Sequence, residues 1–331
     1  MNENNKTRVL VVATHGIGDV VMLIPTLVRI VESGSELKIV VKDKTCKEVV
    51  EYFLGSSIEF LCLSSVNGAP PMKALRVLKW IRNSRCGVSI SQFGVSAQLY
   101  SLLVFLGGTK KRYGWYGRLS FLNTDSLKAA GLHKVEENSR FLPLLGIGHS
   151  IDDCYVELKC DEARETPTVV LGPGSGFVER HKRWGTDCFA QLANRLVEEL
   201  VEEVVIIGGG EEVELCNEVE RLANNPKVKS LAGEFTVTQT LNYLKENKVV
   251  VSNCNGISHL AAAVGCYVVG LYGPTNFSLT GPYSPRATRV SANLDCSPCY
   301  RRNYITGCGS PVCMNAITVD MAFDAVKKIV G

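Results

Sequence analysis

A short polar segment between two apolar runs carries the residues best suited to chemistry in this chain. Residues 16–19 (Gly-Ile-Gly-Asp) follow residues 8–13, a run typical of a buried strand, and precede an apolar helical run. Glycines let the backbone turn sharply and let a ligand approach closely, and a carboxylate can take a proton from a hydroxyl group. Taken alone, Asp19 fits two roles: a cap for the helix that follows, or a general base at the end of a buried strand.

Three turns in the second half also follow strand-like runs, and each suits an anion. Residues 172–176 (Gly-Pro-Gly-Ser-Gly) precede Lys182, residues 208–210 are a glycine triplet after the next strand, and residues 252–256 (Ser-Asn-Cys-Asn-Gly) precede a helix that carries His259. A further turn at residues 271–275 (Leu-Tyr-Gly-Pro-Thr) ends another strand. Backbone N–H groups at a helix start can bind a diphosphate, and a lysine can reach one. Neither a P-loop nor a complete dinucleotide-binding fingerprint is present. His259 fits a ligand contact and an ordinary core histidine equally well.

Four cysteines near the C-terminus have ligand-like spacing. Cys296, Cys299, Cys308 and Cys313 lie within 18 residues. Four thiolates can enclose zinc or iron, and such a closed site is structural because it leaves no coordination position for substrate. The equal alternative is a loop with reduced thiols or disulfides. Many of the other cysteines stand alone in apolar runs, which indicates a reduced interior.

Alternating strands and helices must position these turns. The expected strands are residues 8–13, 37–41, 58–63, 87–90, 168–171, 203–207, 248–251 and 267–271. The expected helices are residues 20–30, with a kink at Pro25, and residues 73–83, 96–106, 186–199, 211–224, 257–264 and 316–330. This pattern predicts an α/β protein with two doubly wound parallel sheets that face each other across a cleft. The domains are expected at residues 1–160 and 165–331 with a polar crossing at 152–167. The helix at 316–330 either stays in the second domain or packs back on the first.

Composition narrows the functional classes. A net charge of +3 over 331 residues is too small to indicate a nucleic-acid partner. Basic clusters at residues 110–112, 180–183 and 301–302 fit solvated loops, or contacts with phosphates of a ligand or of anionic lipid. The polar N-terminus does not resemble a signal peptide, and the apolar stretch at residues 99–106 is too short to span a bilayer. We therefore expect a cytoplasmic protein.

The motifs, taken in order, resemble those of glycosyltransferase family 9, the heptosyltransferases of lipopolysaccharide core assembly. The resembling pieces are residues 16–19 with Pro25, residues 111–115, 133–136, 142–146, 173–175, 182–184 and 231–234, Gly256, His259 with 261–263, and residues 272–275.

This resemblance implies a GT-B fold in which the N-terminal half binds an acceptor and the C-terminal half binds a nucleotide-activated sugar, typically ADP-heptose. Sugar transfer to a lipid-linked or other cell-surface glycan, at the inner membrane surface, would invert the anomeric centre and need no metal. Asp19 would be the general base, and Lys182 would neutralise charge on the leaving diphosphate. The implied donor-binding residues are Ser175, Gly176, Glu234, Asn255, Gly256, Ile257, His259, Gly273 and Thr275. The implied acceptor-binding residues are Gly16, Gly18, Lys111 and Arg112.

One position departs from the family pattern. Members usually carry Asp and then Ser or Thr before the glycine that is Gly256 here, and this chain has Cys254 and Asn255. The family Asp contacts hydroxyls of the donor sugar, which a thiol cannot grip in the same way. Either the donor is not heptose, or Asn253 or Asn255 holds the hydroxyls, or activity is weakened. The alternative functions are a protein O-heptosyltransferase-like enzyme and, because of Cys254, a catalytically weakened nucleotide-sugar-binding protein.

Overall fold

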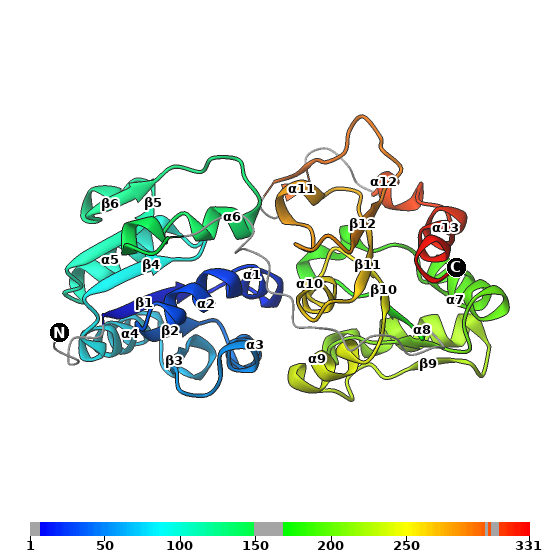
Figure 1. Cartoon of the computed structure of the whole chain (residues 1–331), viewed down its shortest axis with the longest axis horizontal. Coiled ribbons are helices and arrows are strands. Elements are labelled where there is room, and N and C mark those ends of the chain that lie inside the picture. The colour runs from blue at the N-terminus through cyan, green and yellow to red at the C-terminus, as the bar shows by residue number, and fades with distance from the viewer. Residues whose placement is uncertain (1–6, 149–167, 302–303, 306–310) are drawn as a thin grey trace. The chain divides into compact units, whose positions relative to one another are not determined.

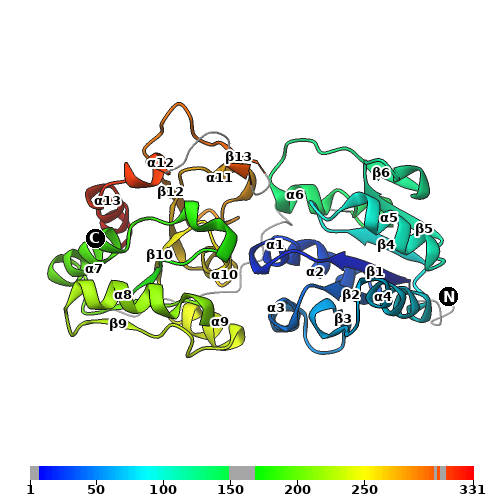
Figure 2. The same ribbon diagram turned by 180° about the vertical axis from the view of Figure 1, so that it is seen from behind.

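The computed structural model describes residues 7–148, 168–301, 304–305 and 311–331, and the chain forms two compact units, residues 1–156 and 157–331 (Figures 1 and 2). Each unit contains a six-stranded parallel sheet with helices packed against it. The polar crossing expected at residues 152–167, and with it the expected domain boundary, lies outside the described residues.

The first unit is a doubly wound sheet with strand order β3-β2-β1-β4-β5-β6. The strands are β1 (Arg8–Ala13), β2 (Glu36–Val41), β3 (Glu59–Cys62), β4 (Val88–Ser91), β5 (Lys111–Trp115) and β6 (Asp125–Leu127). The helices are α1 (Ile17–Val21), α2 (Ile24–Glu32), α3 (Lys44–Leu54), α4 (Pro70–Ser84), α5 (Ala97–Leu106) and α6 (Lys134–Ser139), with 3-10 turns η1 (Leu63–Ser65), η2 (Ser120–Leu122) and η3 (Pro143–Leu145). The strand order reverses between β1 and β4, and ligands of such sheets bind beyond the strand ends at this point.

The second unit repeats the same topology, with strand order β12-β11-β10-β7-β8-β9. Its strands are β7 (Val169–Gly172), β8 (Val204–Ile206), β9 (Val228–Ser230), β10 (Val249–Asn253), β11 (Tyr267–Leu271) and β12 (Ala287–Val290), and a separate ribbon pairs β13 (Tyr300–Arg301) with β14 (Tyr304–Ile305). Its helices are α7 (Thr186–Glu199), α8 (Val213–Ala223), α9 (Val237–Lys245), α10 (Gly256–Ala263), α11 (Phe277–Thr280), α12 (Val312–Asn315) and α13 (Val319–Val330), with 3-10 segments η5 (Phe177–Lys182) and η6 (Gly210–Glu212). Here the order reverses between β7 and β10.

Apolar strands and amphipathic helices produce these elements much as the sequence predicts. Seven of the eight expected strands both begin and end within one residue of the observed ones, and β10 continues two residues further than expected, to Asn253. The single helix expected at residues 20–30 is two helices in the structure. Helix α1 ends at Val21 and α2 begins at Ile24, so the helix is interrupted just before Pro25. Proline lacks an N–H donor and clashes with the carbonyl four residues earlier, here that of Val21. It is tolerated in the first turn of a new helix, where the structure places it.

The closing helix α13 packs within the second unit. It contacts α7 and the sheet strands β10, β11 and β12, and it buries Ala322, Phe323 and Val326 in the core of that unit. It begins at Val319, after Thr318 caps it by accepting a hydrogen bond from the N–H of Met321. Across the described residues, every helix is too short or too polar to cross a membrane.

One buried carboxylate organises the loop that leads into α6. Glu137 has no exposed surface, and its Oε1 accepts hydrogen bonds from the N–H groups of Ala130 (2.7 Å), Gly131 (3.0 Å) and Leu132 (3.3 Å). Its Oε2 pairs with Arg140 at 2.6 Å. The carboxylate thus replaces water for three loop donors at once.

We expect Glu137→Ala to lower the free energy of unfolding by about 3–5 kcal/mol, because it leaves Arg140 and three backbone donors without their buried partner. Urea denaturation followed by circular dichroism measures this change. Glu218→Ala, which removes an exposed carboxylate paired with Arg221, is the control and should have little effect. Equal losses in the two variants would contradict the structural role of Glu137.

Candidate active site

Asp19 does not cap the helix in which it lies. Gly16 is the N-cap of α1, and no side chain makes a capping hydrogen bond there. The Asp19 carboxylate instead accepts a hydrogen bond from Lys134 Nζ at 2.6 Å and lies 3.7 Å from His15 Nδ1. Its side chain is 22% exposed, so solvent or a ligand can reach it. Of the two roles that the sequence allows, the structure excludes the cap and leaves a partly exposed carboxylate that is paired with Lys134.

Three segments surround Asp19 at the carboxyl ends of β1 and β4. The N–H of His15 donates to Gln92 Oε1 at 3.4 Å, which joins the loops that follow these two strands. Asn138 of α6 donates to the carbonyl of Met22 (3.3 Å) and accepts from the N–H of Phe93 (2.7 Å). Helix α6 is thereby fixed over the strand ends, and this placement delivers Lys134 to Asp19. Gly16, the N-cap of α1, and Gly18, in its first turn, also belong to this group.

Lys111 and Arg112 do not join this group. Both begin β5, and Lys111 is in register with Val88 and therefore with Val9, at the opposite edge of the sheet from Asp19. The Arg112 side chain is also engaged, because it donates to the carbonyls of Leu122 (2.7 Å) and Thr109 (2.6 Å).

In the second unit, the loops after β7 and β10 meet at the point where the strand order reverses, and Asn255 joins them. Its Nδ2 donates to the carbonyls of Gly172 (3.1 Å) and Gly174 (3.0 Å). Its Oδ1 accepts from Ser252 Oγ (2.8 Å) and from the N–H of Ser258 (3.1 Å), which makes Asn255 the N-cap of α10. Both donors and both acceptor positions of this amide are occupied.

Asn253 is used in the same way. It is fully buried, donates to the carbonyl of Pro173 at 2.7 Å and accepts from the N–H of Trp184 at 3.1 Å. Asn255 therefore has no spare hydrogen-bonding capacity, and Asn253 has no exposed surface. Neither side chain is placed to hold sugar hydroxyls in place of the family aspartate.

Lys182 lies at the end of η5, close to the loop that follows β7. Its side chain is 7% exposed, and Nζ pairs with Glu179 Oε1 at 2.6 Å. Ser175 is held by its neighbour Arg183, whose Nε donates to Ser175 Oγ at 3.0 Å and whose Nη2 donates to the Ser175 carbonyl at 3.0 Å. Sequence reasoning missed Glu179 and Arg183. The spacing Glu179-x-x-Lys182 was the available signal for the ion pair.

Helix α10 directs its first turn toward the same end of the sheet. Gly256 and Ile257 are its first residues, and N–H groups at these positions have no partner inside a helix. His259 follows in the second half of that turn and is buried. Gly176 is exposed at the start of η5, and Glu234 is exposed in the turn after β9.

The turn after β11 brings Gly273 and Thr275 to the same edge. Thr275 is 7% exposed, and its hydroxyl oxygen is buried with no hydrogen-bond partner among the described residues. The neighbouring Tyr272 lies beside the Cys254 thiol, and burial, with a smaller contribution from Cys254, raises the pKa of Tyr272 well above its ordinary value. The Tyr272 phenol is therefore neutral at physiological pH.

The cysteine segment packs on this turn. Cys299 N–H donates to the carbonyl of Pro274 at 3.0 Å, and a methyl group on Gly273 would lie 2.7 Å from Cys313 Sγ. Burial, with Cys299 and Cys296 as lesser causes, raises the pKa of the Cys313 thiol. Within the described residues no three metal-ligating side chains are arranged to hold an ion, and Cys308 lies outside them. The described cysteines thus do not by themselves make a metal site.

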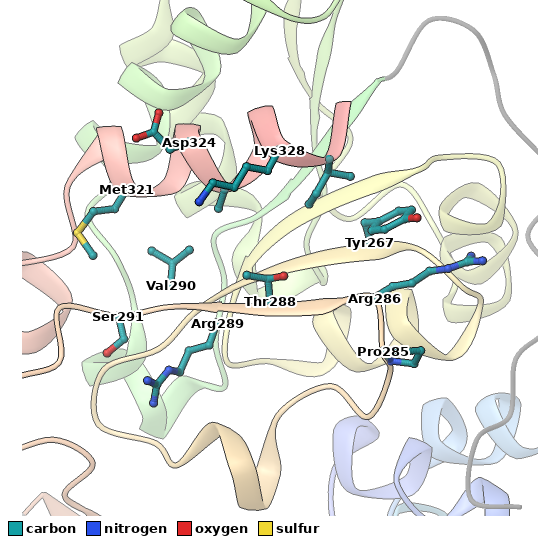
Figure 3. Close-up of a pocket in the computed structure, with 12 residues that line it drawn as sticks. Tyr267, Pro285, Arg286, Thr288, Arg289, Val290, Ser291, Met321, Asp324 and Lys328 are labelled. Atoms are coloured by element: carbon teal, nitrogen blue, oxygen red, sulfur yellow. The ribbon is translucent and has the colours of Figure 1, made fainter. Parts of the chain in front are cut away.

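A separate pocket of about 540 Å³ lies on the flank of the second unit, between β12 and α13 (Figure 3). Arg286 and Arg289 on the strand side and Asp324 and Lys328 of α13 line it. None of the residues predicted to bind the donor contributes to it, so it is distinct from the loops at the carboxyl ends of the strands.

Comparisons with known proteins identify the family to which this chain is similar. A family model described as glycosyltransferase family 9 (heptosyltransferase) matches residues 96–308, a range that begins after Asp19. Lipooligosaccharide heptosyltransferase 2 of Campylobacter jejuni is 28% identical over 48% of this chain and 50% of its own length. Lipopolysaccharide heptosyltransferase 2 of Escherichia coli is 33% identical over 37% of this chain and 36% of its own length. The chain thus spans about half or less of the length of these curated relatives.

Solved structures match nearly the whole chain. The E. coli ADP-heptose lipopolysaccharide heptosyltransferase II covers 98% of both chains with a TM-score of 0.73 at 20% identity. The dodecameric iron-containing heptosyltransferase TibC covers 99% of this chain and 78% of its own, with a TM-score of 0.60 at 15% identity. These matches confirm the predicted α/β, GT-B class of two Rossmann-like, doubly wound parallel-sheet domains.

Proposed function

The chain belongs to glycosyltransferase family 9, and on this premise we propose that it is an inverting, metal-independent glycosyltransferase. It takes a nucleotide-activated sugar, ADP-heptose in the simplest case, and transfers the sugar to a hydroxyl group of a lipopolysaccharide-core or other cell-surface glycan. The acceptor binds the first unit and the donor binds the second. The observation that carries this proposal is the Asp19 carboxylate, which is partly exposed and does not cap its helix.

Asp19 acts as the general base in this proposal. The acceptor hydroxyl gives its proton to the carboxylate, its oxygen forms a bond to the anomeric carbon, and the bond from that carbon to the nucleoside diphosphate breaks with its electron pair going to the phosphate oxygen. Attack from the face opposite the leaving group inverts the anomeric centre. Lys134, whose Nζ is 2.6 Å from Asp19 Oδ1, supports the role because its hydrogen bond orients the carboxylate.

The second unit stabilises the leaving diphosphate in this proposal. The N–H groups of Gly256 and Ile257 and the positive end of the α10 dipole favour an anion at the strand ends. Lys182 adds a cation, and the Thr275 hydroxyl adds a free donor. These groups act on charge that grows as the anomeric bond breaks, so they lower the barrier more than they strengthen donor binding. No step needs a metal.

A second function, nucleotide-sugar binding without catalysis, is favoured by one observation. Cys254 stands where family members place a carboxylate. The neighbouring Asn253 and Asn255 donate their amide hydrogens to backbone carbonyls at the end of β7 and in the loop that follows it. If nothing else grips the sugar hydroxyls, the donor would bind by its nucleotide alone and would not be positioned for attack.

A donor panel separates these functions. Purified protein is incubated with ADP-heptose, GDP-mannose or UDP-glucose and a heptose-free lipopolysaccharide core acceptor, with EDTA present, and nucleoside diphosphate release is measured. We expect acceptor-dependent ADP release from ADP-heptose that EDTA does not change. Calorimetric binding of ADP with no turnover of any donor would instead favour the binding protein, and turnover lost in EDTA would contradict metal-independent transfer.

A further inference from the structure

One continuous segment of the first unit contains basic residues but no acidic ones. Residues 60–124 contain nine Lys and Arg and not one Asp or Glu, whereas the chain as a whole has 36 basic and 33 acidic residues. The rest of the chain is therefore net acidic. Charge segregation of this kind does not stabilise a fold, since like charges repel, but it creates a field that attracts a polyanionic partner.

Helix α5, in the middle of this part, exposes an apolar face. Leu99, Leu102, Phe105 and Leu106 are between 38% and 56% exposed, and their spacing of three and four residues places them on one side of the helix. The opposite side is anchored, because Tyr100 is buried and donates its hydroxyl to the Tyr113 carbonyl at 2.7 Å. A helix face this apolar is unusual on a free protein surface.

Neighbouring elements extend this face and surround it with cations. Phe121 of η2, which packs on α5, is 75% exposed. The guanidinium of Arg112 lies over the Phe105 ring at 5.5 Å, and Arg82 of α4 donates to the Leu106 carbonyl at 3.1 Å. Lys110, Lys111 and Arg118 are exposed and form no ion pair with the described residues. Helix α5 and β5, which carry most of these residues, adjoin in both views (Figures 1 and 2).

We propose that this surface docks on an anionic phospholipid bilayer. We define the α5 surface as Leu99, Leu102, Phe105, Leu106 and Phe121 together with Lys110, Lys111, Arg112 and Arg118. Its apolar side chains enter the boundary between headgroups and acyl chains, and its cations contact headgroup phosphates. A second copy of the chain is a poorer occupant, because a symmetric pair would set these cations against each other.

The proposal has a geometric consequence for the candidate site in the same unit. Helix α5 begins shortly after Gln92, which accepts a hydrogen bond from His15 near Asp19, and it ends near Lys110 at the opposite edge of the sheet. The N-terminal end of the α5 surface thus lies at the sheet edge that carries Asp19. A bilayer on this surface would lie beside that edge, where a lipid-linked hydroxyl is easily reached. Docking itself needs no turnover and does not rest on the proposed function.

Vesicle co-sedimentation of the full chain tests the docking. Vesicles of phosphatidylcholine alone are compared with vesicles that contain phosphatidylglycerol as well, at low and high salt. One variant, Lys110→Glu/Lys111→Glu, reverses charge at two exposed positions, and a second, Leu99→Gln/Leu102→Gln, removes apolar contact. The matched controls are Lys227→Glu/Lys229→Glu and Leu222→Gln, at exposed positions of the second unit.

We expect binding to the anionic vesicles only, weakened at high salt because exposed charges are screened. Charge reversal should weaken binding at least about 25-fold, at about fivefold for each cation removed. The double leucine variant should weaken it about tenfold or more, and the controls should match the wild type. Equal binding to both vesicle types, or equal loss in the controls, would overturn the proposal. So would a change of sedimentation mass in the leucine variant without a change in vesicle binding, which would identify a self-association surface.

Discussion

Replacing Asp19 by Asn should lower kcat for sugar transfer by about 10²–10⁴-fold while donor binding stays nearly unchanged, because the amide cannot take the proton of the acceptor hydroxyl. The substitution keeps the size and shape of the side chain, and Asp19 makes no capping bond whose loss would disturb α1. The variant should therefore fold normally. Nucleoside diphosphate release with saturating acceptor measures kcat, and calorimetry with the donor measures binding.

A matched control distinguishes catalysis from a general effect of charge. Asp43 also lies at the start of a helix in the first unit, where it caps α3 by accepting from the N–H of Cys46 at 2.9 Å. Asparagine caps helices as well as aspartate does, so Asp43→Asn should keep full activity and stability. Full turnover in Asp19→Asn would remove the general base from the proposed mechanism, and equal losses in both variants would point to a nonspecific cause.

Replacing Lys182 by Met should lower kcat by about 10²–10³-fold, because the methionine keeps the apolar stem and removes the cation that acts on the leaving diphosphate. A separate loss of donor affinity should come from Glu179, whose carboxylate is 2.6 Å from Lys182 Nζ and would then repel the diphosphate without that cation beside it. Glu179→Gln/Lys182→Met should therefore recover donor affinity relative to Lys182→Met alone but should not recover kcat.

Steady-state kinetics with varied donor separates these two effects, since affinity follows KM and stabilisation of the transition state follows kcat. Lys248→Met is the control. Lys248 is exposed just before β10, at the opposite end of that strand from the loop at residues 254–256. It should leave both constants unchanged. If Lys182→Met alters only KM, Lys182 binds the donor without stabilising the leaving group, and its assignment as a catalytic residue fails.

Several features of this molecule are local and could be predicted from the sequence. Strands buried on both faces are continuous apolar runs, such as residues 249–251, and turns after them are marked by glycine and asparagine. The break before Pro25, between α1 and α2, follows from the missing N–H of proline. In a parallel sheet, the loops that follow the strands all lie at the carboxyl ends of those strands. The sequence therefore also predicts which loops lie close together.

The roles of individual polar side chains depend on tertiary contacts, which no local sequence pattern contains. The family motif predicts that Lys111 and Arg112 bind the acceptor, yet the strand register places them at the edge of the sheet opposite Asp19. Asn255 was considered for sugar hydroxyls, but its amide joins two loops that are more than 80 residues apart in the chain. Glu137 and Lys134 carry no signal of their burial or partners, because these come from the placement of α6.

The sequence by itself determined the α/β architecture, the repeated topology and the loops that carry polar residues, because periodicity and turn chemistry act between neighbours in the chain. Only the tertiary structure decided what each polar side chain does. It pairs Asp19 with Lys134, commits Asn253 and Asn255 to the backbone, and leaves the Thr275 hydroxyl without a described partner. The physical reason is that hydrogen bonds and ion pairs act over about 3 Å, so their partners are fixed by packing and not by separation in sequence.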